Sequence, residues 1–340
     1  MTAPKRSADP EWNEPKRSAD PKSNLAEELL RGDARSLARA MSLVENGAPE
    51  AEALLERIYG ARPAAPRVGI TGPPGAGKST LVAELALLLR RQGKRVGVVA
   101  VDPTSPYTGG AILGDRVRMS ELSTDPEVFI RSMATRGSLG GLAARTEELA
   151  ELLSGWGSDI TLIETVGVGQ SELDVAQAAD TTLVVLTPES GDAIQSLKAG
   201  LMEIADVFVV NKSDHAGADQ LAATIRSALA LRGPSPWRPP IVMTVATERR
   251  GIDELYEAIE KHRAHLADPK ASGGARREKI RARLKNAVRE RLLEAAWDRQ
   301  GLGDLLDRAA DQVLGGAVSP YRAARDLIER ITDHGERSPN

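Results

Sequence analysis

The sequence predicts an α/β fold with a doubly wound, mainly parallel sheet and helical extensions at both ends. Short apolar runs alternate with stretches of helical spacing between residues 62 and 267, the pattern of a parallel sheet wrapped by crossover helices. Several runs are continuous in Val, Ile and Leu, as expected of strands that are buried on both faces. A glycine-rich loop stands between the first run and a helical stretch, where such sheets bind phosphate.

The composition limits what the chain can recognise. Of its 340 residues 41% are hydrophobic, enough for one large core, but only 3% are aromatic. Base stacking on aromatic platforms is therefore not expected, and a net charge of −3 offers no general attraction for nucleic acid or an anionic membrane. Cysteine is absent, which excludes disulfides and thiolate metal sites.

The first 22 residues predict a disordered tail. They contain the hexapeptide Lys-Arg-Ser-Ala-Asp-Pro twice, at Lys5–Pro10 and Lys16–Pro21, and lack the apolar core of a secretory signal. No run of about 18 apolar residues occurs along the chain, so no membrane span is predicted. We therefore expect a cytoplasmic protein.

Helices and strands are predicted in order from Ser23 onward. Apolar residues at helical spacing indicate two or three helices in an N-terminal arm, residues 23–61, before the P-loop domain of residues 62–267. The strands expected in this domain are Arg67–Thr71, Arg95–Val101, Ile160–Glu164, Thr182–Thr187, Val207–Asn211 and Ile241–Val245.

The C-terminal section is predicted to be helical. Residues 268–335 are rich in Arg, Leu and Ala at helical spacing, and residues 336–340 form a short tail. Ser319 and Pro320 are expected to be the cap and the first turn of the last helix.

The strongest chemical signal is a phosphate-binding loop, Gly72-Pro73-Pro74-Gly75-Ala76-Gly77-Lys78-Ser79. It directly follows a predicted strand and directly precedes a helical run that begins at Thr80. The glycines let backbone N–H groups turn inward, and the helix N-terminus adds partial positive charge, so the loop forms an anion cradle. Lys78 is expected to neutralise the β- and γ-phosphates, and Ser79 to place its hydroxyl on Mg²⁺.

The base is predicted to be selected by Asn211-Lys212-Ser213-Asp214, at the end of an apolar strand. The carboxylate of Asp214 can accept hydrogen bonds from the N1–H and the exocyclic amine of guanine, whereas adenine offers neither group. Val245, Ala246 and Thr247 follow the next strand and either close over the base through backbone N–H groups or form a plain turn. The sequence thus predicts a Mg²⁺-dependent nucleotide hydrolase selective for GTP.

Two acids end strands at the edge where Mg²⁺ and water would lie. Asp102 and Glu164 both follow apolar runs, and the carboxyl ends of strands are where α/β sheets bind ligands. Glu164-Thr165-Val166-Gly167 has the form of a γ-phosphate sensor in which the Gly167 N–H contacts the phosphate. Residues 104–119, including Asp115, are either a mobile switch that faces the phosphates or an ordinary loop.

Two further charged patterns are less specific. Asp192, Gln195 and Lys198 recur every three residues, which on spacing alone most often marks a solvated helix face. The basic stretch between Arg276 and Arg291 is interrupted by Glu and Leu, which favours a solvated or partner-facing helix over a nucleic-acid surface. The four histidines are scattered and predict no metal site.

Together these motifs resemble the MeaB/ArgK family of P-loop GTPases. The resemblance extends from about Leu25 to Ile331 and rests on Gly72–Ser79, Val101–Pro106, Thr108–Asp115, Glu164–Glu172 and Asn211–Asp214. It implies a GTPase chaperone that gates adenosylcobalamin loading of an acyl-CoA mutase, protects the mutase and helps expel damaged cofactor. It also implies a homodimer formed through the C-terminal helices.

The resemblance also implies roles for single residues. Asp102, Asp115 and Glu164 look like the acids around Mg²⁺, and Lys198, with Asp192 and Gln195, looks like part of a third switch that responds to the mutase. The candidate catalytic residues are therefore Lys78, Asp115, Asp192, Gln195 and Lys198.

The hydrolysis is expected to be slow without a partner. Val168 follows Gly167, so no glutamine stands there to orient water, and a partner would have to complete the site. Three rival functions stay open. A metal-insertion GTPase would need His or Cys ligands for its cargo, a kinase of a protein partner would transfer labelled γ-phosphate, and a pure binding module would show no turnover.

Overall fold

The computed structural model describes residues 21–103, 122–135, 141–165, 171–189, 200–233, 235–268 and 302–333, with single residues and short runs between 270 and 292. A seven-stranded sheet with the order β3-β2-β4-β1-β5-β6-β7 forms its centre, and every described pairing between these strands is parallel. The strands are β1 (Arg67–Thr71), β2 (Val96–Pro103), β3 (Val128–Thr135), β4 (Ile160–Thr165), β5 (Thr181–Leu186), β6 (Val207–Val210) and β7 (Ile241–Met243). The predicted fold class is confirmed.

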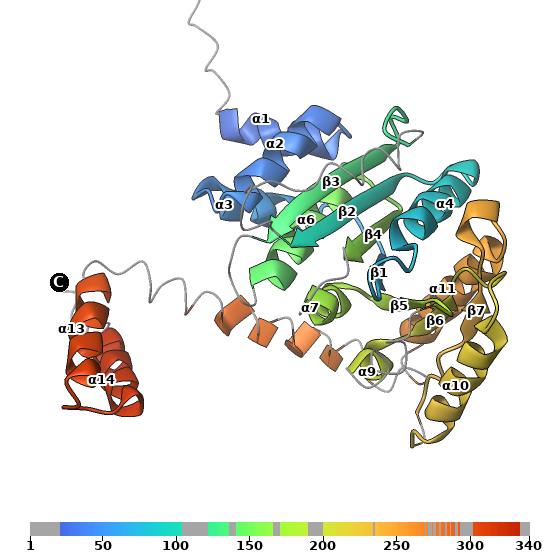
Figure 1. Cartoon of the computed structure of the whole chain (residues 1–340). Helices are drawn as coiled ribbons and strands as arrows, with labels where there is room; N and C mark the ends of the chain where they lie inside the picture. The colour runs from blue at the N-terminus through green and yellow to red at the C-terminus, as the bar shows by residue number, and fades with distance from the viewer. Residues whose placement is uncertain are drawn as a thin grey trace, which may run out of the picture.

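Helices cover both faces of this sheet (Figure 1). Val98 of β2 and Leu162 of β4 belong to the core under α4 (Lys78–Arg91) and α11 (Ile252–Ala267), whereas the neighbouring Val99 and Ile163 belong to the core on the opposite face. That second face is covered by α1 (Pro21–Leu30), α2 (Ala34–Glu45), α3 (Glu50–Ile58), α6 (Gly141–Trp156), α7 (Ser171–Ala178), α9 (Met202–Ile204) and α10 (Ala218–Ala230). Because successive side chains of a strand alternate between faces, continuous apolar strands fill both cores.

The strand β3 is absent from the sequence prediction, whereas the other strands lie where the sequence places them, with small shifts at their ends. Arg131 and Ser132 interrupt the apolar run of β3. The strand lies at the sheet edge and pairs only with β2 among the described strands, so it can carry polar side chains. Arg131 uses this position to pair with Glu45 of α2.

The three N-terminal helices share a core with the sheet. Leu29, Met41 and Ile58, one from each helix, are buried in the same cluster as Trp156 of α6 and Val99 of β2. Helix α1 begins at Pro21, slightly before the expected start at Ser23, which fits the preference of proline for the first helical position. The boundary between an arm, residues 23–61, and the domain, residues 62–267, stays a proposal.

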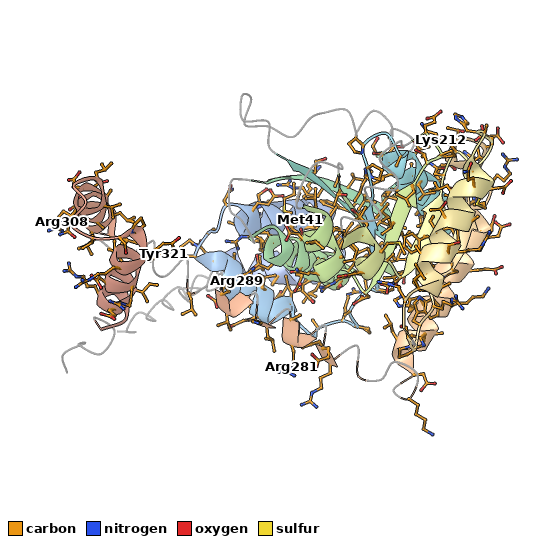
Figure 2. The ribbon with its side chains drawn as sticks, turned by 60° about the horizontal axis from the view of Figure 1, so that its bottom comes forward. Met41, Lys212, Arg281, Arg289, Arg308 and Tyr321 are labelled. Atoms are coloured by element: carbon orange, nitrogen blue, oxygen red, sulfur yellow. The ribbon has the colours of Figure 1, made fainter. Side chains whose placement is uncertain are left out.

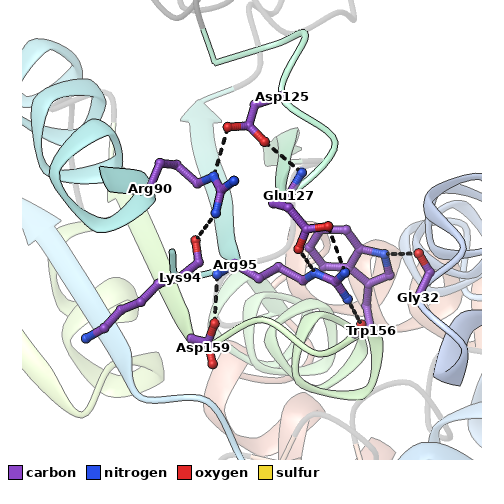
Figure 3. A network of polar contacts seen from close by, with 8 residues as sticks. All are labelled: Gly32, Arg90, Lys94, Arg95, Asp125, Glu127, Trp156 and Asp159. Atoms are coloured by element: carbon purple, nitrogen blue, oxygen red, sulfur yellow. Dashed lines mark hydrogen bonds and ion pairs between the residues drawn. The ribbon is translucent and has the colours of Figure 1, made fainter. Parts of the chain in front are cut away.

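A polar network fastens the turn between α1 and α2 to the sheet (Figure 3). The indole Nε1 of Trp156 donates to the carbonyl of Gly32 at 2.9 Å. The guanidinium of Arg95 lies 4.6 Å from the centre of the Trp156 ring and pairs with Glu127 at 2.6 Å. A Cβ on Gly32, whose φ is 91°, would come within 3.1 Å of Arg95, so glycine suits both the backbone and the close approach.

We expect Trp156→Ala to lower the free energy of unfolding by about 3–5 kcal/mol, because it empties a buried aromatic volume. Trp156→Phe should cost less, since a ring stays beside Phe129, whose centroid lies 6.0 Å from that of Trp156. Urea unfolding followed by circular dichroism measures both variants. A loss below about 1 kcal/mol for Trp156→Ala would show that the arm is held by other contacts.

The C-terminal helices lie to one side of the sheet (Figures 1 and 2). Helices α13 (Leu302–Leu314) and α14 (Pro320–Asp333) lie side by side, with Arg308 and Tyr321 far from Lys212. Pro320 is the first residue of α14, and Ser319 Oγ accepts from the Arg322 N–H at 3.3 Å, which confirms the predicted cap. The described helices include none with the length and the apolar composition that a membrane span requires.

Candidate functional site

The phosphate-binding loop leaves the central strand of the sheet. β1 lies between β4 and β5, and the chain runs from it to β2 on one side and reaches β5 on the other. Open α/β sheets bind ligands at the carboxyl edge where the strand order reverses in this way. Gly72 has a φ of 142°, and a Cβ there would lie 2.1 Å from the Val185 carbonyl of β5. The loop therefore starts tightly packed on β5 and opens toward the carboxyl edge.

Lys78 is the first residue of α4, and only 5% of it is exposed. Its Nζ donates to the carbonyls of Gly72 at 2.9 Å and Pro73 at 3.0 Å. The ammonium thus lies over the loop, next to the positive end of the α4 dipole. Phosphate oxygens are stronger acceptors than neutral carbonyls, so Lys78 is placed to donate to phosphate when a nucleotide enters.

A hydroxyl and a carboxylate meet beside the loop. Ser79 Oγ donates to Glu164 Oε1 at 2.6 Å, and Glu164, in the neighbouring strand β4, is buried. These hard oxygen donors fit Mg²⁺. Asp102 lies in β2, shortly beyond Ala100, which pairs with Glu164, but the Asp102 side chain lies outside the described residues. In the described part of the chain, no three His, Asp or Glu side chains form a metal cluster.

Asn211 joins the phosphate loop to the predicted guanine motif. Its buried side chain donates from Nδ2 to the Ala76 carbonyl at 2.9 Å. Its Oδ1 accepts from Thr244 Oγ1 at 3.0 Å and from the Ala246 N–H at 3.2 Å. One side chain therefore fixes three segments: the loop, the end of β6 and the turn after β7. It also occupies the Ala246 N–H, one of the groups expected to close over the base.

The rest of the turn after β7 is held by its own backbone. The N–H of Val245 donates to the Arg250 carbonyl at 3.0 Å, and Thr247 lies in the short 3₁₀ helix Ala246–Glu248. Gly251 follows the turn. A side chain does not fit at this residue, because a Cβ would lie 2.1 Å from the Met243 carbonyl. Asn211 thus holds Ala246 beside the guanine motif, but the N–H groups of Val245 and Ala246 that were expected to face the base are bonded within the protein.

Asp214 lies at the rim of the site with 39% of its side chain exposed. Lys212 has a left-handed φ of 54° and its Nζ lies 3.0 Å from Glu189 Oε2. His215 Nδ1 lies 2.6 Å from Glu189 Oε1, and its Nε2 lies 3.6 Å from Asp214 Oδ2. Lys212, and to a smaller degree His215, hold the pKa of Glu189 below its usual range.

The sequence prediction misses Glu189 and His215. Glu189 follows the end of β5, and His215 directly follows the guanine motif. Their polar side chains just after strand ends are the feature of the sequence that could have indicated them. The structure brings together residues 72–80, Glu164, 211–214 and 245–247. Asp115, Gly167, Asp192, Gln195 and Lys198 lie outside the described residues, and their roles stay predictions.

We expect Gly77→Ala to weaken guanine nucleotide binding at least about tenfold, a loss of roughly 1.4 kcal/mol. Gly77 has a φ of 83°, and an added Cβ would lie 2.4 Å from Asn211 Nδ2, which is fixed by its other contacts. Gly93→Ala is the matched control, because Gly93 has a φ of 75° and open space around it. Titration with a fluorescent GDP analogue measures both variants. Equal losses would mean that a general loss of stability, and not the contact with Asn211, sets the effect.

Comparisons with known proteins agree with this arrangement. A family model described as methylmalonyl Co-A mutase-associated GTPase MeaB matches residues 37–301. A putative GTPase of Pyrococcus abyssi is 45% identical over 318 residues, which cover 92% of this chain and 97% of that protein. The mouse protein named methylmalonic aciduria type A homolog, mitochondrial, is 37% identical over 320 residues, or 88% and 77% of the two chains. A crystal structure described as LAO/AO transport system kinase is 30% identical, has a TM-score of 0.68 and is matched over 91% of this chain and 97% of its own.

Proposed function

Because the chain belongs to the MeaB family of mutase-associated GTPases, it is a GTPase that binds guanine nucleotides, and we propose that residues 72–80, Glu164 and 211–214 form its Mg²⁺-dependent site. The observation that carries this proposal is the Asn211 side chain, which bonds to Ala76 of the phosphate loop and to Ala246. This contact fixes the distance between the phosphate loop and the base motif. A nucleotide requires such a fixed distance, because its phosphates and its base are bound at the same time.

The chain's own residues act by positioning and by charge. Backbone N–H groups of the loop and the N-terminus of α4 bind the phosphates, and Lys78 donates to them. Asp214 accepts from the guanine base. When bound, Mg²⁺ neutralises charge on the β- and γ-phosphates, and Ser79 and Glu164 are the described residues that would hold it. Val168 follows Gly167, where a glutamine would orient water, so we propose that a partner completes the hydrolytic site.

We further propose that the partner is an adenosylcobalamin-dependent acyl-CoA mutase, methylmalonyl-CoA mutase or a close relative. The description of the matching family and the name of the mouse relative both point to methylmalonyl metabolism. In this proposal the nucleotide state gates loading of the cofactor, protection of the mutase and its reactivation. The identity of the mutase rests on these two descriptions, because the site residues recognise only the nucleotide.

The C-terminal section supports the proposal of a homodimer. Ile280, Leu284, Val288 and Leu292 recur every fourth residue along the section and are 47–66% exposed. On α14, Tyr321 is 88% exposed. Large exposed apolar patches mark surfaces at which proteins interact. Sedimentation of the full chain tests the dimer, and a monomer at micromolar concentration would contradict it.

The gating proposal predicts that mutase affinity depends on the nucleotide. We expect the dissociation constants measured with a non-hydrolysable GTP analogue and with GDP to differ at least about fivefold, since a coupling free energy of about 1 kcal/mol is the least that makes a switch. Calorimetric titration of the purified mutase with the full chain measures both states. Equal affinities for methylmalonyl-CoA mutase and its relatives would remove the gating function but would leave GTP hydrolysis intact.

A kinase function is a second candidate because the similar crystal structure carries that description. It requires an acceptor for the γ-phosphate. Incubation of the chain with γ-labelled GTP and a cell extract separates the two functions. Release of labelled inorganic phosphate without any labelled protein or small molecule supports the hydrolase, whereas a labelled acceptor supports the kinase.

A further inference from the structure

Glu189 contacts two residues that flank the guanine-selecting carboxylate. Its Oε2 lies 3.0 Å from Lys212 Nζ, and its Oε1 lies 2.6 Å from His215 Nδ1. Asp214 lies between these two residues in the sequence. Glu189 follows β5 and the motif follows β6, so the carboxylate links two neighbouring strand ends of the sheet.

The backbone of the motif is anchored on its inner side. Asn211 is buried and its N–H donates to the Leu186 carbonyl at 2.8 Å, while the Ser213 N–H donates to the Thr244 carbonyl at 3.0 Å. These bonds fix the strand end but leave the outer side, with Lys212, Asp214 and His215, facing the rim. On that side the His215 N–H donates to the Lys212 carbonyl at 3.0 Å, and the Glu189 carboxylate contacts the side chains of both residues.

His215 connects Glu189 to Asp214. The two nitrogens of its ring face the two carboxylates, Nδ1 toward Glu189 at 2.6 Å and Nε2 toward Asp214 at 3.6 Å. Lys212 has a left-handed backbone, which is unusual for a residue with a side chain and turns the motif sharply at that point. The orientation of Asp214 therefore depends on how its two neighbours are held.

We propose that Glu189 is a positioning residue for guanine recognition: it holds Lys212 and His215 so that the Asp214 carboxylate faces the N1–H and the exocyclic amine of the base. This inference rests on the proposed role of Asp214 in selecting guanine. It adds a specificity determinant from outside the motif, contributed by the strand next to it.

The contacts of Glu189 are exposed, so their effect should appear in base selection more than in stability. The side chains of Glu189, Lys212 and His215 are 53%, 37% and 43% exposed. Exposed ion pairs contribute little to folding. Lys212 and His215 lower the pKa of Glu189, which favours its carboxylate form, and the contacts are lost as the pH falls through that lowered pKa.

The test compares guanine with hypoxanthine, which offers the N1–H but lacks the exocyclic amine. Competition against a fluorescent nucleotide gives the dissociation constants of GDP and IDP for the full chain. We expect Glu189→Ala to weaken GDP binding about fivefold, the loss of roughly one hydrogen bond, and to lower the preference for GDP over IDP by a similar factor. Glu257→Ala is the matched control, because Glu257 makes an exposed pair with Lys261 at 3.3 Å away from the motif.

A second variant separates positioning from general damage. His215→Ala should reproduce the lost preference, and the double variant should lose little more than either single variant, because both act through one chain of contacts. An unchanged preference for GDP over IDP in Glu189→Ala or in His215→Ala overturns the proposal. Asp214→Asn tests the premise separately: if it leaves GDP affinity unchanged, the assignment of the guanine motif has failed, and not merely the role of Glu189.

Discussion

Lys78→Ala is expected to lower the rate of GTP hydrolysis by about 10²–10³-fold, the effect of removing one preorganised donor from a developing negative charge. Lys78 is nearly buried, and its Nζ lies within hydrogen-bond distance of two loop carbonyls, Gly72 and Pro73. Alanine removes the ammonium that donates to these carbonyls and that is expected to donate to the phosphates. The rate of GTP hydrolysis should therefore fall more than it does when an exposed lysine is replaced.

The measurement is phosphate release under single-turnover conditions, so that binding and chemistry are separated. Lys261→Ala is the matched control, because that lysine is 71% exposed and pairs only with Glu257 among the described ion pairs. Lys78→Arg should rescue little, since a planar guanidinium cannot take the place of a compact ammonium in the loop. Turnover by Lys78→Ala within threefold of the parent protein would exclude the loop as the catalytic centre.

Asp214→Asn is expected to weaken GTP binding at least about a hundredfold, because two hydrogen bonds to a charged group contribute about 1.5–3 kcal/mol each. The amide presents donor hydrogens toward the N1–H and the exocyclic amine of guanine, which are donors themselves. Xanthine carries a carbonyl in place of that amine, so xanthosine nucleotides should bind the variant better than they bind the parent protein.

Competition titrations with GDP, XDP and ADP measure this change of base preference. Asp219→Asn serves as the control, since Asp219 lies nearby in the first turn of α10 and is exposed. The phosphate contacts are unchanged in both variants, so ADP affinity should stay constant. A parallel loss for all three nucleotides would indicate damage to the loop instead of a change in base selection.

Local patterns in the sequence were sufficient for most of the sheet. Buried strands such as β1 and β6 are short apolar runs that end at recognisable motifs, and they appear where predicted. β3 was missed because an edge strand tolerates Arg131, whose charge is satisfied by α2 from far away in the sequence. The sequence also does not predict how the N-terminal helices pack on the domain, because this packing depends on the tertiary contact of Trp156 with Gly32.

The sequence likewise predicts only part of the candidate site. The sequence places the phosphate loop and Glu164 at the ends of strands, where α/β sheets bind ligands, and the hydrogen bond from Ser79 to Glu164 agrees with this. Sequence alone cannot show that Asn211 reaches Ala76, or that Glu189 reaches Lys212, because such contacts are set by strand order and side-chain direction. Strand order places β5 beside β6, and the order emerges only from the fold.

The central claim is that one site binds a triphosphate in the loop and reads guanine through Asp214. Initial rates of phosphate release from GTP and from ATP, each with Mg²⁺ and with excess EDTA, test it most directly. We predict turnover of GTP that requires Mg²⁺ and a kcat/KM for ATP lower by about 10²-fold or more. Equal use of ATP, or GTP turnover that persists in EDTA, would contradict the account.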